Sequence, residues 1–292
     1  MDLPYKKVHV IINPAAGKDE SILNTINKVF HQYGVDWQVS ITRKFGDATR
    51  LAKLAIADGV DLVAGYGGDG TQMEIANAVM GSETPMAILP GGTGNAMSFE
   101  LRVPRKLDQA VELICQSYKT QKIDLAMIGE QYFMLRAYSG IEESDKTSRE
   151  DKDRFGNLAY IMDSIRGFKN PPHAKYQLTI DEKEIELEGL TCLVLNSGSV
   201  GGINLKATDR VSVSDGLLDV FIVKKDLPSV TALASYLLDI GNTHIGVYHW
   251  KGKKVHVAAD PPQTTWIDGE IYGPTPYTIS VIPEGVSIVV PE

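Results

Sequence analysis

Short apolar runs alternate with helix-like apolar spacing from Val8 to about Tyr118. The run VHVII is followed by the loop NPAAGK and then by residues whose apolar members fall on one helical face; this succession recurs three more times, ending with PMAILPGGTGNAMSFEL. Two sets of apolar positions define the first helix and the second strand: Ile22, Ile26, Val29 and Phe30, then Val35, Trp37, Val39 and Ile41. Alternating strands and helices predict βαβ units and a parallel sheet with ligand-binding loops at the carboxyl ends of its strands.

A different pattern begins after Asp124. Nine short runs, several of them alternating, are separated by Gly, Asp, Asn or Pro turns: IDLAMI, YFMLRAY, YQLTID, KEIEL, TCLVLNS, LLDVFIV, KVHVAAD, TTWID and YTISVI. They predict a mostly antiparallel β domain, a sandwich or a barrel, interrupted by helices near Leu158–Phe168 and Leu227–Ile240. The charged segment Glu142–Arg154 is expected to be a solvated helix or a mobile loop. The expected domains are residues 1–123 and 124–292, with a C-terminal tail that could return to the first.

Composition narrows the class of protein. The 292 residues are 43% hydrophobic, enough for two cores, and the net charge of −8 argues against a nucleic-acid partner. Cys115 and Cys192 are isolated in the sequence, which suggests neither a zinc site nor a disulfide framework and fits a reducing, cytoplasmic compartment. The first apolar run ends at Asn13-Pro14 and is interpreted as a buried strand, not a signal. Of the histidines, His244 and His249 are expected to flank a loop in structural or surface roles.

The segment Gly65 to Gly70, GYGGDG, satisfies the dinucleotide pattern G-x-G-x-x-G between a strand and a helix. That pattern also requires an acidic residue about 20 positions later, but Glu83 comes too early and the next acid is Glu100. The ordinary P-loop is excluded because no Lys precedes Thr71. Two readings remain: a glycine-rich turn, or a phosphate-binding loop and helix N-terminus in which Asp69 holds Mg²⁺ directly or through water.

Two further loops favour the phosphate reading. PGGTGN, from Pro90 to Asn95, follows the next strand, and NPAAGK, from Asn13 to Lys18, follows the first. Loops at the carboxyl ends of neighbouring parallel strands converge on one crevice, which is where such sheets bind ligands. The sequence therefore predicts a phosphate-binding edge on the N-terminal domain.

These stretches carry a family resemblance. INPAAGK, GGDGTQMEIAN and LPGGTGNA resemble the signature stretches of the diacylglycerol kinase catalytic domain, a group that includes sphingosine kinases and bacterial lipid kinases. GGDGT is also found in NAD kinases and phosphofructokinases, but RFGNLAY, LNSGSVGG, SDGLLDV and WIDGE resemble later landmarks of the bacterial lipid kinases. The resemblance covers nearly the whole chain. It implies a Rossmann-like α/β domain and a β-sandwich-like domain, with ATP and Mg²⁺ in the cleft between them.

The resemblance also implies roles for individual residues. Glu270 is expected to be the catalytic base that takes the proton of the acceptor hydroxyl, although an Asp-Gly pair between two strands would otherwise predict only a hairpin turn. Asp69 is expected to serve the metal side. Residues implicated in nucleotide binding are Asn13, Thr42, Gly68, Asp69, Gly70, Thr71, Glu74, Gly92, Thr93 and Asn95. A second, structural Mg²⁺ is expected on the Asp215 carboxylate and the carbonyls of Ser212 and Leu217.

The leading hypothesis is an ATP-dependent, Mg²⁺-requiring kinase that phosphorylates the hydroxyl of a lipid such as diacylglycerol or a sphingoid base. Its substrate would be reached by transient, peripheral contact with a membrane, and a homodimer is left open. The alternatives are an NAD kinase and a non-catalytic nucleotide or lipid sensor with the same fold. Two departures from the family pattern concern the site: Ala96 stands where members often have Asp, and residues 140–143 replace a different motif on the acceptor side.

Overall fold

The computed structural model describes residues 3–16, 20–140, 173–198, 211–224 and 247–292. Clustering of contacts divides the chain into an N-terminal unit, Met1–Ile123 with Glu284–Glu292, and a C-terminal unit, Asp124–Pro283. The segments Leu158–Phe168 and Leu227–Ile240, expected to be helical, and the charged segment Glu142–Arg154 lie outside the described residues. Within the described ranges, no helix combines the length and the apolar character needed to cross a membrane.

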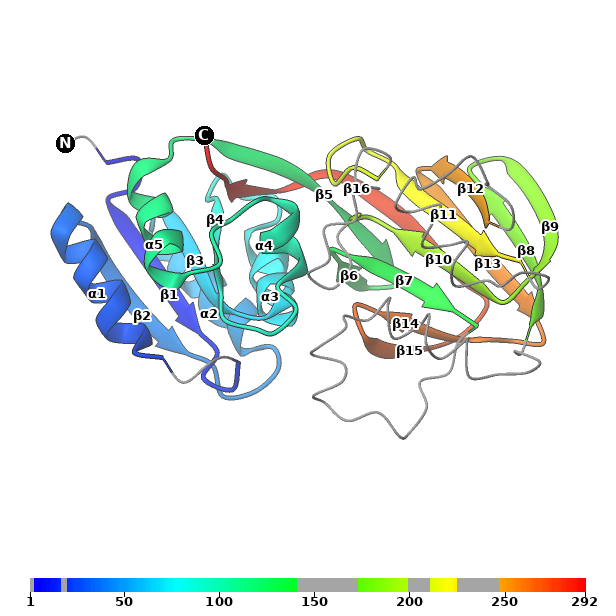
Figure 1. Cartoon of the computed structure of the whole chain (residues 1–292), viewed down its shortest axis with the longest axis horizontal. Helices are drawn as coiled ribbons and strands as arrows, with labels where there is room; N and C mark the ends of the chain where they lie inside the picture. Colours follow the sequence, from blue (N-terminus) through cyan, green and yellow to red (C-terminus); the bar gives the residue numbers. More distant parts are fainter. Residues whose placement is uncertain (1–2, 17–19, 141–172, 199–210, 225–246) are drawn as a thin grey trace. The chain divides into compact units, whose positions relative to one another are not determined.

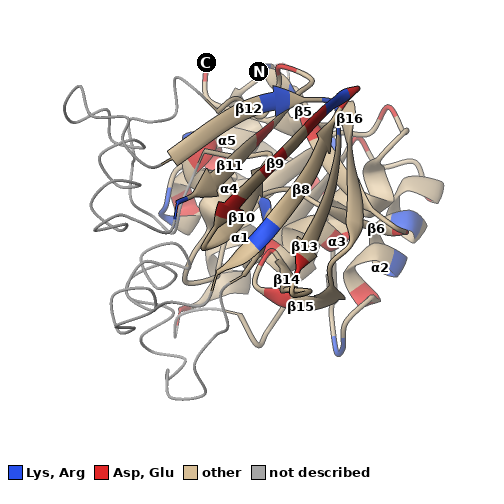
Figure 2. Cartoon of the chain, turned by 90° about the vertical axis from the view of Figure 1, so that its right-hand side faces the viewer, with Lys and Arg blue, Asp and Glu red and all other residues tan. Residues whose placement is uncertain are grey.

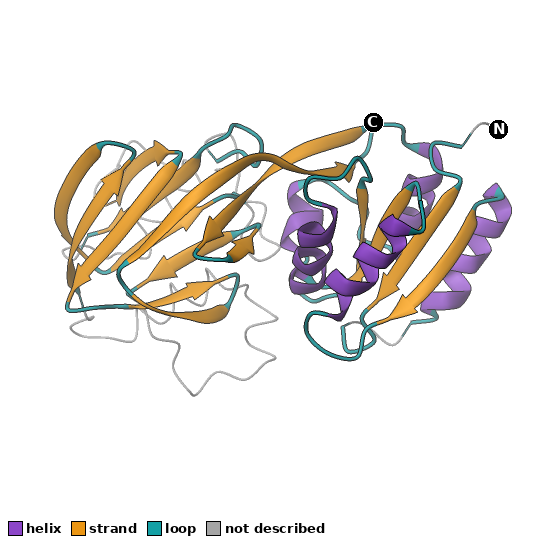
Figure 3. Ribbon diagram, turned by 180° about the vertical axis from the view of Figure 1, so that it is seen from behind, coloured by secondary structure: helices purple, strands orange, loops and turns teal. Residues whose placement is uncertain are grey.

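The N-terminal unit is an α/β domain, as expected. Its elements in chain order are β1 (Lys7–Ile12), α1 (Ile22–Tyr33), β2 (Asp36–Ile41), α2 (Asp47–Ala57), β3 (Leu62–Gly67), α3 (Asp69–Val79), β4 (Met86–Pro90), α4 (Ala96–Glu100) and α5 (Leu107–Gln116). The four strands are parallel in the order β2-β1-β3-β4 (Figure 1). Helix α1 packs against α5, and α2 packs against α3. All helices of the described residues belong to this unit (Figure 3).

Strand order determines where this unit can bind a ligand. The chain leaves β1 toward β2 on one side of the sheet and leaves β3 toward β4 on the other. In an open parallel sheet, ligands bind at the carboxyl ends of the two neighbouring strands where the direction of the connections reverses. The loop that begins at Asn13 and the loop Gly68–Thr71 lie at this switch point.

Part of the apolar face of β2 is less buried than its alternating sequence predicts. Trp37 packs against Phe30 of α1, with ring centroids 5.8 Å apart. However, Val39 and Ile41, on the same alternating face, are 41% and 54% exposed. Because β2 is the edge strand of the parallel sheet, the alternation predicts the strand correctly but leaves part of its apolar face uncovered.

The C-terminal unit is a β sandwich. Its strands are β5 (Thr120–Ile128), β6 (Gln131–Phe133), β7 (Arg136–Ser139), β8 (Ala174–Ile180), β9 (Lys183–Gly189), β10 (Thr191–Leu195), β11 (Leu218–Val223), β12 (Val247–Gly252), β13 (Lys254–Asp260), β14 (Thr264–Ile267), β15 (Glu270–Pro274) and β16 (Tyr277–Val289). One sheet has the antiparallel order β12-β11-β10-β7-β14-β15, and the other contains β16-β13-β8-β9, with β5 and β6 beside β16. Side chains such as Tyr176, Val194, Val220 and Val257 form one buried core with members from both sheets.

Two strand predictions need correction. The run YFMLRAY is not one strand, because β6 ends at Phe133 and β7 begins only at Arg136. The segment VYHWKG was not among the expected strands but forms β12, so His249, which was expected to flank a loop, lies inside a strand. The periodicity missed β12 because Tyr248, His249 and Trp250 are all only partly covered, so neither face has a clear apolar repeat.

An acidic row lies along β9, which forms the end of its sheet (Figure 2). The exposed members of this row are Glu184, Glu186 and Glu188, whereas Ile185 and Leu187 pack against the core. Charged side chains on an edge strand oppose pairing with another chain. The charges of this row therefore protect the edge.

Candidate functional site

The three loops of the N-terminal unit meet through hydrogen bonds. The Asn13 backbone N–H donates to the Tyr66 carbonyl at 2.9 Å, and the Asn13 side-chain Nδ2 donates to the Thr71 hydroxyl at 3.0 Å. The Gly91 N–H donates to the Gly67 carbonyl at 3.1 Å. The structure thus brings the ends of β1, β3 and β4 together, with Asn13 and Thr71 joined across the switch point.

Close packing explains two of the glycines. A Cβ added at Gly92 would lie 2.4 Å from the Gly68 Cα, so the second and third loops approach backbone to backbone. A Cβ at Gly67 would lie 2.5 Å from the Thr71 hydroxyl oxygen. Gly70 differs, because a Cβ there would meet nothing within 4 Å. The first turn of α3 therefore presents open space at Gly70, as an approaching phosphate would require.

Asp69 joins α3 to the third loop. Its carboxylate oxygens accept the backbone N–H groups of Ala96 at 3.0 Å and Met97 at 3.1 Å, which are the first residues of α4. Asn95, in the left-handed region at φ 47°, accepts the Gly92 N–H on its side-chain oxygen at 3.0 Å. Asp69 thus organises the loop through backbone contacts. The side chain of Ala96 takes no part in this contact, so Asp69 needs no carboxylate at position 96 to hold α4.

The remaining residues that were predicted to bind the nucleotide differ in how deeply they are buried. Thr42 is buried, and its hydroxyl donates to the Ile12 carbonyl at 3.5 Å. Glu74 binds the start of α2, since its carboxylate accepts the Ala48 N–H at 3.0 Å and its carbonyl accepts the Thr49 hydroxyl at 2.7 Å. Thr93 is exposed in the third loop. Thr42 and Glu74 therefore support the edge of the sheet, whereas Thr93 is accessible to a ligand.

Tyr66 supports the loops and carried no signal in the sequence reading. Its ring lies under Gly91, where an added Cβ would be 2.7 Å away, and its hydroxyl donates to the Glu20 carboxylate at 2.6 Å. Burial, together with the hydrogen bond to Glu20, raises the pKa of Tyr66 well above its ordinary value. In a sequence, a tyrosine within an apolar strand cannot be told from an ordinary core aromatic residue. Only the tertiary contacts therefore identify the role of Tyr66.

Glu270, the expected base, belongs to the C-terminal unit. It is exposed at the start of β15, directly after the turn Asp268-Gly269, in which both residues have positive φ. Asp268 holds that turn, because its carboxylate accepts backbone N–H groups from Met134 at 3.2 Å, Leu135 at 3.2 Å and Arg136 at 2.8 Å. The Glu270 carboxylate is therefore accessible, and Asp268 anchors the turn that precedes it.

Asn196 holds the same backbone segment from the other side. Its buried Nδ2 group donates to the carbonyls of Asp124 and Met134, each at 2.9 Å. The backbone N–H groups of Asn196 and Ser197 both donate to the Leu135 carbonyl. Together with Asp268 they provide the hydrogen bonds that the break between β6 and β7 requires. Asn196 and Asp268 lie within LNSGSVGG and WIDGE, so the motifs contained this signal although their roles were missed.

The turn before β11 holds Asp215. The Asp215 carboxylate accepts the Leu217 N–H at 3.1 Å and the Lys251 ammonium at 2.8 Å. The neighbouring carboxylate of Asp124 accepts the Gly216 N–H at 2.7 Å. No group of three or more His, Cys, Asp and Glu side chains within the described ranges is arranged to hold a metal ion. These donors do not fit the structural Mg²⁺ expected on Asp215, Ser212 and Leu217, because an ammonium group already contacts the carboxylate.

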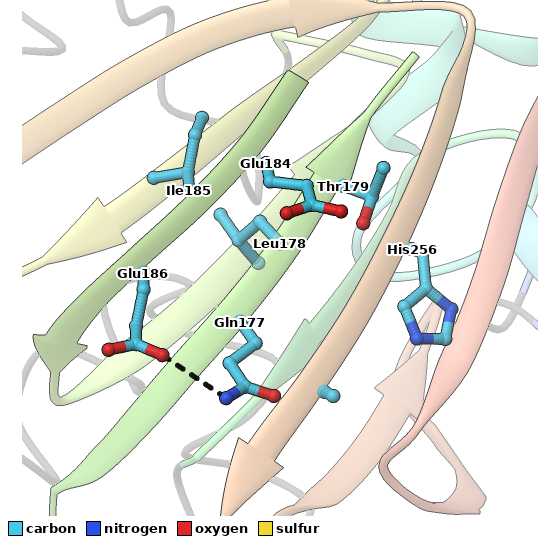
Figure 4. Close-up of a pocket in the computed structure, with 8 residues that line it drawn as sticks. Gln177, Leu178, Thr179, Glu184, Ile185, Glu186 and His256 are labelled. Carbon is cyan, nitrogen blue, oxygen red and sulfur yellow. Dashed lines mark hydrogen bonds between the residues drawn. The ribbon is translucent and has the colours of Figure 1, made fainter. Parts of the chain in front are cut away.

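A hollow of about 410 Å³ lies on the outer face of the C-terminal unit (Figure 4). Side chains of β8, β9 and β13 line it, among them Gln177, Glu186 and His256. The Gln177 amide donates to Glu186 at 3.2 Å, and the His256 ring nitrogen Nδ1 is 2.9 Å from the Thr278 hydroxyl. None of the predicted site residues lines this hollow, and it is not the candidate site.

Comparison with known proteins agrees with the three loops and the sandwich. Residues 7–128 match the family model described as "Diacylglycerol kinase catalytic domain", and residues 136–290 match the "YegS C-terminal NAD kinase beta sandwich-like domain". A relative from Staphylococcus aureus named "Putative lipid kinase" is 34% identical and aligns over 80% of this chain and 78% of its own. An uncharacterized protein from Synechocystis is 28% identical over 98% of this chain and 70% of its own.

Solved structures show the same likeness. The crystal structure of a "putative diacylglycerol kinase" from Bacillus anthracis has a TM-score of 0.87 and 28% identity, and the match covers 100% of this chain and 99% of that one. A second Bacillus anthracis structure with the same description has a TM-score of 0.85. The glycine loops of the N-terminal unit, the β sandwich of the C-terminal unit and the sequence matches all point to the same family. This chain belongs to the diacylglycerol kinase catalytic-domain family.

Proposed function

We propose that this protein is a lipid kinase that transfers the γ-phosphate of ATP to the hydroxyl of a lipid such as diacylglycerol or a sphingoid base. The observation that carries the proposal is the three-loop edge of the N-terminal unit at the switch point of its sheet. Family membership makes a kinase the first reading of that edge. The exposed Glu270 on its anchored turn supplies the second chemical group that the reaction needs.

In this proposal, the backbone of the second loop, residues 68–71, binds the phosphate. The N–H groups at the start of α3 and the positive end of the helix dipole favour an anion, and Gly70 leaves the space for it. Mg²⁺, which is expected to arrive with the nucleotide, would neutralise charge on the phosphate oxygens. Asp69 and Thr71 carry the oxygen atoms at the start of α3; because both Asp69 carboxylate oxygens already accept backbone N–H groups, Asp69 would hold the cation through water.

Glu270 would act as the general base. The acceptor hydroxyl gives its proton to the Glu270 carboxylate as its oxygen bonds to the γ-phosphorus, and the bond from that phosphorus to the ADP oxygen breaks. Asp268 would hold the carboxylate in place through the backbone of Met134, Leu135 and Arg136. The proposal requires Glu270 to reach a nucleotide bound by the other unit.

The test is transfer of radiolabelled γ-phosphate from ATP to a panel of lipid alcohols in mixed micelles, with NAD included. Glu270→Gln is compared with Glu188→Gln, an exposed glutamate on β9 that serves as the matched control. We expect label in a lipid with wild type and Glu188→Gln and its loss with Glu270→Gln. Label in NAD alone would favour an NAD kinase, and ATP binding without any transfer would favour a sensor.

We also propose that the partner of this enzyme is an anionic membrane surface, contacted by the region at the end of β2. Phe45 is 82% exposed and Ile41 is 54% exposed, and the cations Arg43 and Lys44 lie between them in the sequence. A hollow of about 550 Å³ opens there, lined by Ser40, Ile41, Arg43, Lys44, Asp47, Arg50 and Leu51. Exposed aromatic and aliphatic side chains beside cations are suited to the headgroup region of an anionic bilayer.

Co-sedimentation with vesicles tests this contact. Wild type is expected to bind vesicles that contain phosphatidylglycerol more strongly than vesicles of phosphatidylcholine alone. Phe45→Ser should weaken binding to the anionic vesicles. Leu54→Ser should not, because Leu54 is 53% exposed but lies near the end of α2, away from this region in sequence. Equal binding by both variants would overturn this surface without bearing on the kinase reaction.

A further inference from the structure

The acidic turn before β11 is neutralised by a residue from the neighbouring strand. Asp219 and Lys251 are directly opposite each other in the antiparallel pair β11–β12. From this position the Lys251 Nζ reaches back to the Asp215 carboxylate at 2.8 Å and lies 3.5 Å from the Asp219 Oδ2. One ammonium group therefore contacts two carboxylates, that of Asp215 in the turn and that of Asp219 in β11.

The buried carboxylate of Asp219 requires a cation such as the Lys251 ammonium beside it. Its side chain is completely buried, and its Oδ1 is 2.5 Å from the His249 Nε2. Its Oδ2 is buried and has no hydrogen-bond partner among the described residues, so the Lys251 ammonium at 3.5 Å is the cation that faces it. A buried carboxylate is stable in its charged form only when a cation or donors face it. Removing Lys251 would leave this oxygen without a counter-charge.

The same contacts exclude a divalent ion. Mg²⁺ on Asp215 would require the oxygen that now accepts the Lys251 ammonium, and it would be repelled by that ammonium at close range. The other Asp215 oxygen accepts the Leu217 N–H, and Asp124 accepts the Gly216 N–H. We infer that Lys251 is the resident cation of this turn and takes the position that a structural Mg²⁺ would otherwise occupy. Any divalent ion would then be needed only with the nucleotide.

The inference does not depend on the proposed kinase reaction, and its test uses the full chain without nucleotide or lipid. The protein is treated with EDTA and desalted, its metal content is measured, and thermal unfolding is recorded in EDTA and in MgCl₂ at matched ionic strength. We expect no stoichiometric metal and the same melting temperature in both buffers. Retained magnesium with a lower melting temperature in EDTA would overturn the inference.

Variants distinguish whether Lys251 or a bound Mg²⁺ is the resident cation of the turn. Asp215→Asn is expected to lower the melting temperature equally in EDTA and in MgCl₂, because it weakens a contact with lysine. Lys251→Met should lower it as well, whereas Lys175→Met, which removes an exposed 2.6 Å pair with Glu186, should have little effect. If Asp215→Asn is destabilising only in MgCl₂, a metal and not Lys251 is the resident cation. Should Lys251→Met fail to fold, wild type and Asp215→Asn still decide the question.

Discussion

The Asp268 carboxylate accepts the backbone N–H of Arg136 at 2.8 Å, and the Arg136 carbonyl in turn accepts the Asp268 N–H at 3.0 Å. This reciprocal pair joins the β14–β15 turn to the start of β7. Glu270 is only two residues beyond Asp268 and is exposed. The turn therefore combines an anchored carboxylate and an accessible one, and the two are expected to respond differently to substitution.

Asp268→Asn should reduce both stability and activity. An amide offers one acceptor oxygen and turns an N–H₂ group toward backbone donors, so it leaves at least one of the three N–H groups unpaired. We expect a loss of about 2 kcal/mol in the free energy of unfolding. Glu270→Gln should abolish phosphate transfer and leave the free energy of unfolding unchanged. Urea unfolding of both variants, with the transfer assay, checks this; an Asp268→Asn protein as stable as wild type would contradict it.

Two glycine substitutions should separate loop packing from ligand access. Gly92→Ala places a Cβ 2.4 Å from the Gly68 Cα, so two backbones must move apart, and we expect a loss of about 1–3 kcal/mol. Gly70→Ala meets nothing within 4 Å and improves helix propensity, so stability should be retained. Its methyl group would stand where phosphate is proposed to bind, so calorimetry should record weaker ATP binding. Unchanged ATP affinity in Gly70→Ala would count against the phosphate position.

Asp47 should make stability depend on acid pH. The N–H of Arg43, the Arg50 guanidinium and the N–H of Lys44 together outweigh burial and lower the pKa of Asp47 below its ordinary 3.8. A carboxyl group whose pKa is lowered by folding contributes stability above 3.8, and this contribution is lost as pH falls through the folded-state value. Asp47→Asn should therefore be less stable than wild type at neutral pH, with a difference that shrinks below pH 3.8.

Urea unfolding at a series of pH values measures that difference. Asp36→Asn, at an exposed position that begins β2, is the matched control and should have the stability of wild type throughout. A difference between Asp47→Asn and wild type that stays constant down to pH 3 would show that the charge of Asp47 is not responsible.

The two cysteines report on the two units separately. Burial raises the pKa of the Cys115 thiol in the N-terminal unit and of the Cys192 thiol in the C-terminal unit, each to about 12. Both thiols are therefore expected to resist a disulfide reagent in the native protein at pH 8 and to react at once in guanidinium chloride. Cys115→Ser and Cys192→Ser proteins assign each signal. Rapid native labelling at either position would contradict the buried placement of that thiol.

Much of the fold followed from local pattern. Helical spacing predicted α1 through Ile26, Val29 and Phe30, because a core-facing helix repeats every 3.6 residues whatever it packs against. β12 escaped because its central residues Tyr248, His249 and Trp250 are only partly covered, so neither face has a clear apolar repeat. YFMLRAY gave no sign of its break because the hydrogen-bond partners of that break are distant in sequence. The backbone N–H groups of Met134 and Leu135 donate to the Asp268 carboxylate, about 130 residues further along the chain.

By itself, the sequence determined the βαβ order, the positions of the glycine loops and the candidate residue Asp69, because periodicity, turn chemistry and motif spacing are local properties. Glu270 became a candidate only through the family resemblance. Only the tertiary structure decided what these residues touch. It joined Asp69 to the start of α4 across 27 residues, and Lys251 to Asp215 across 36. Neither pairing leaves a mark in local spacing, since a carboxylate binds whichever donor or cation the packed strands and helices bring to it.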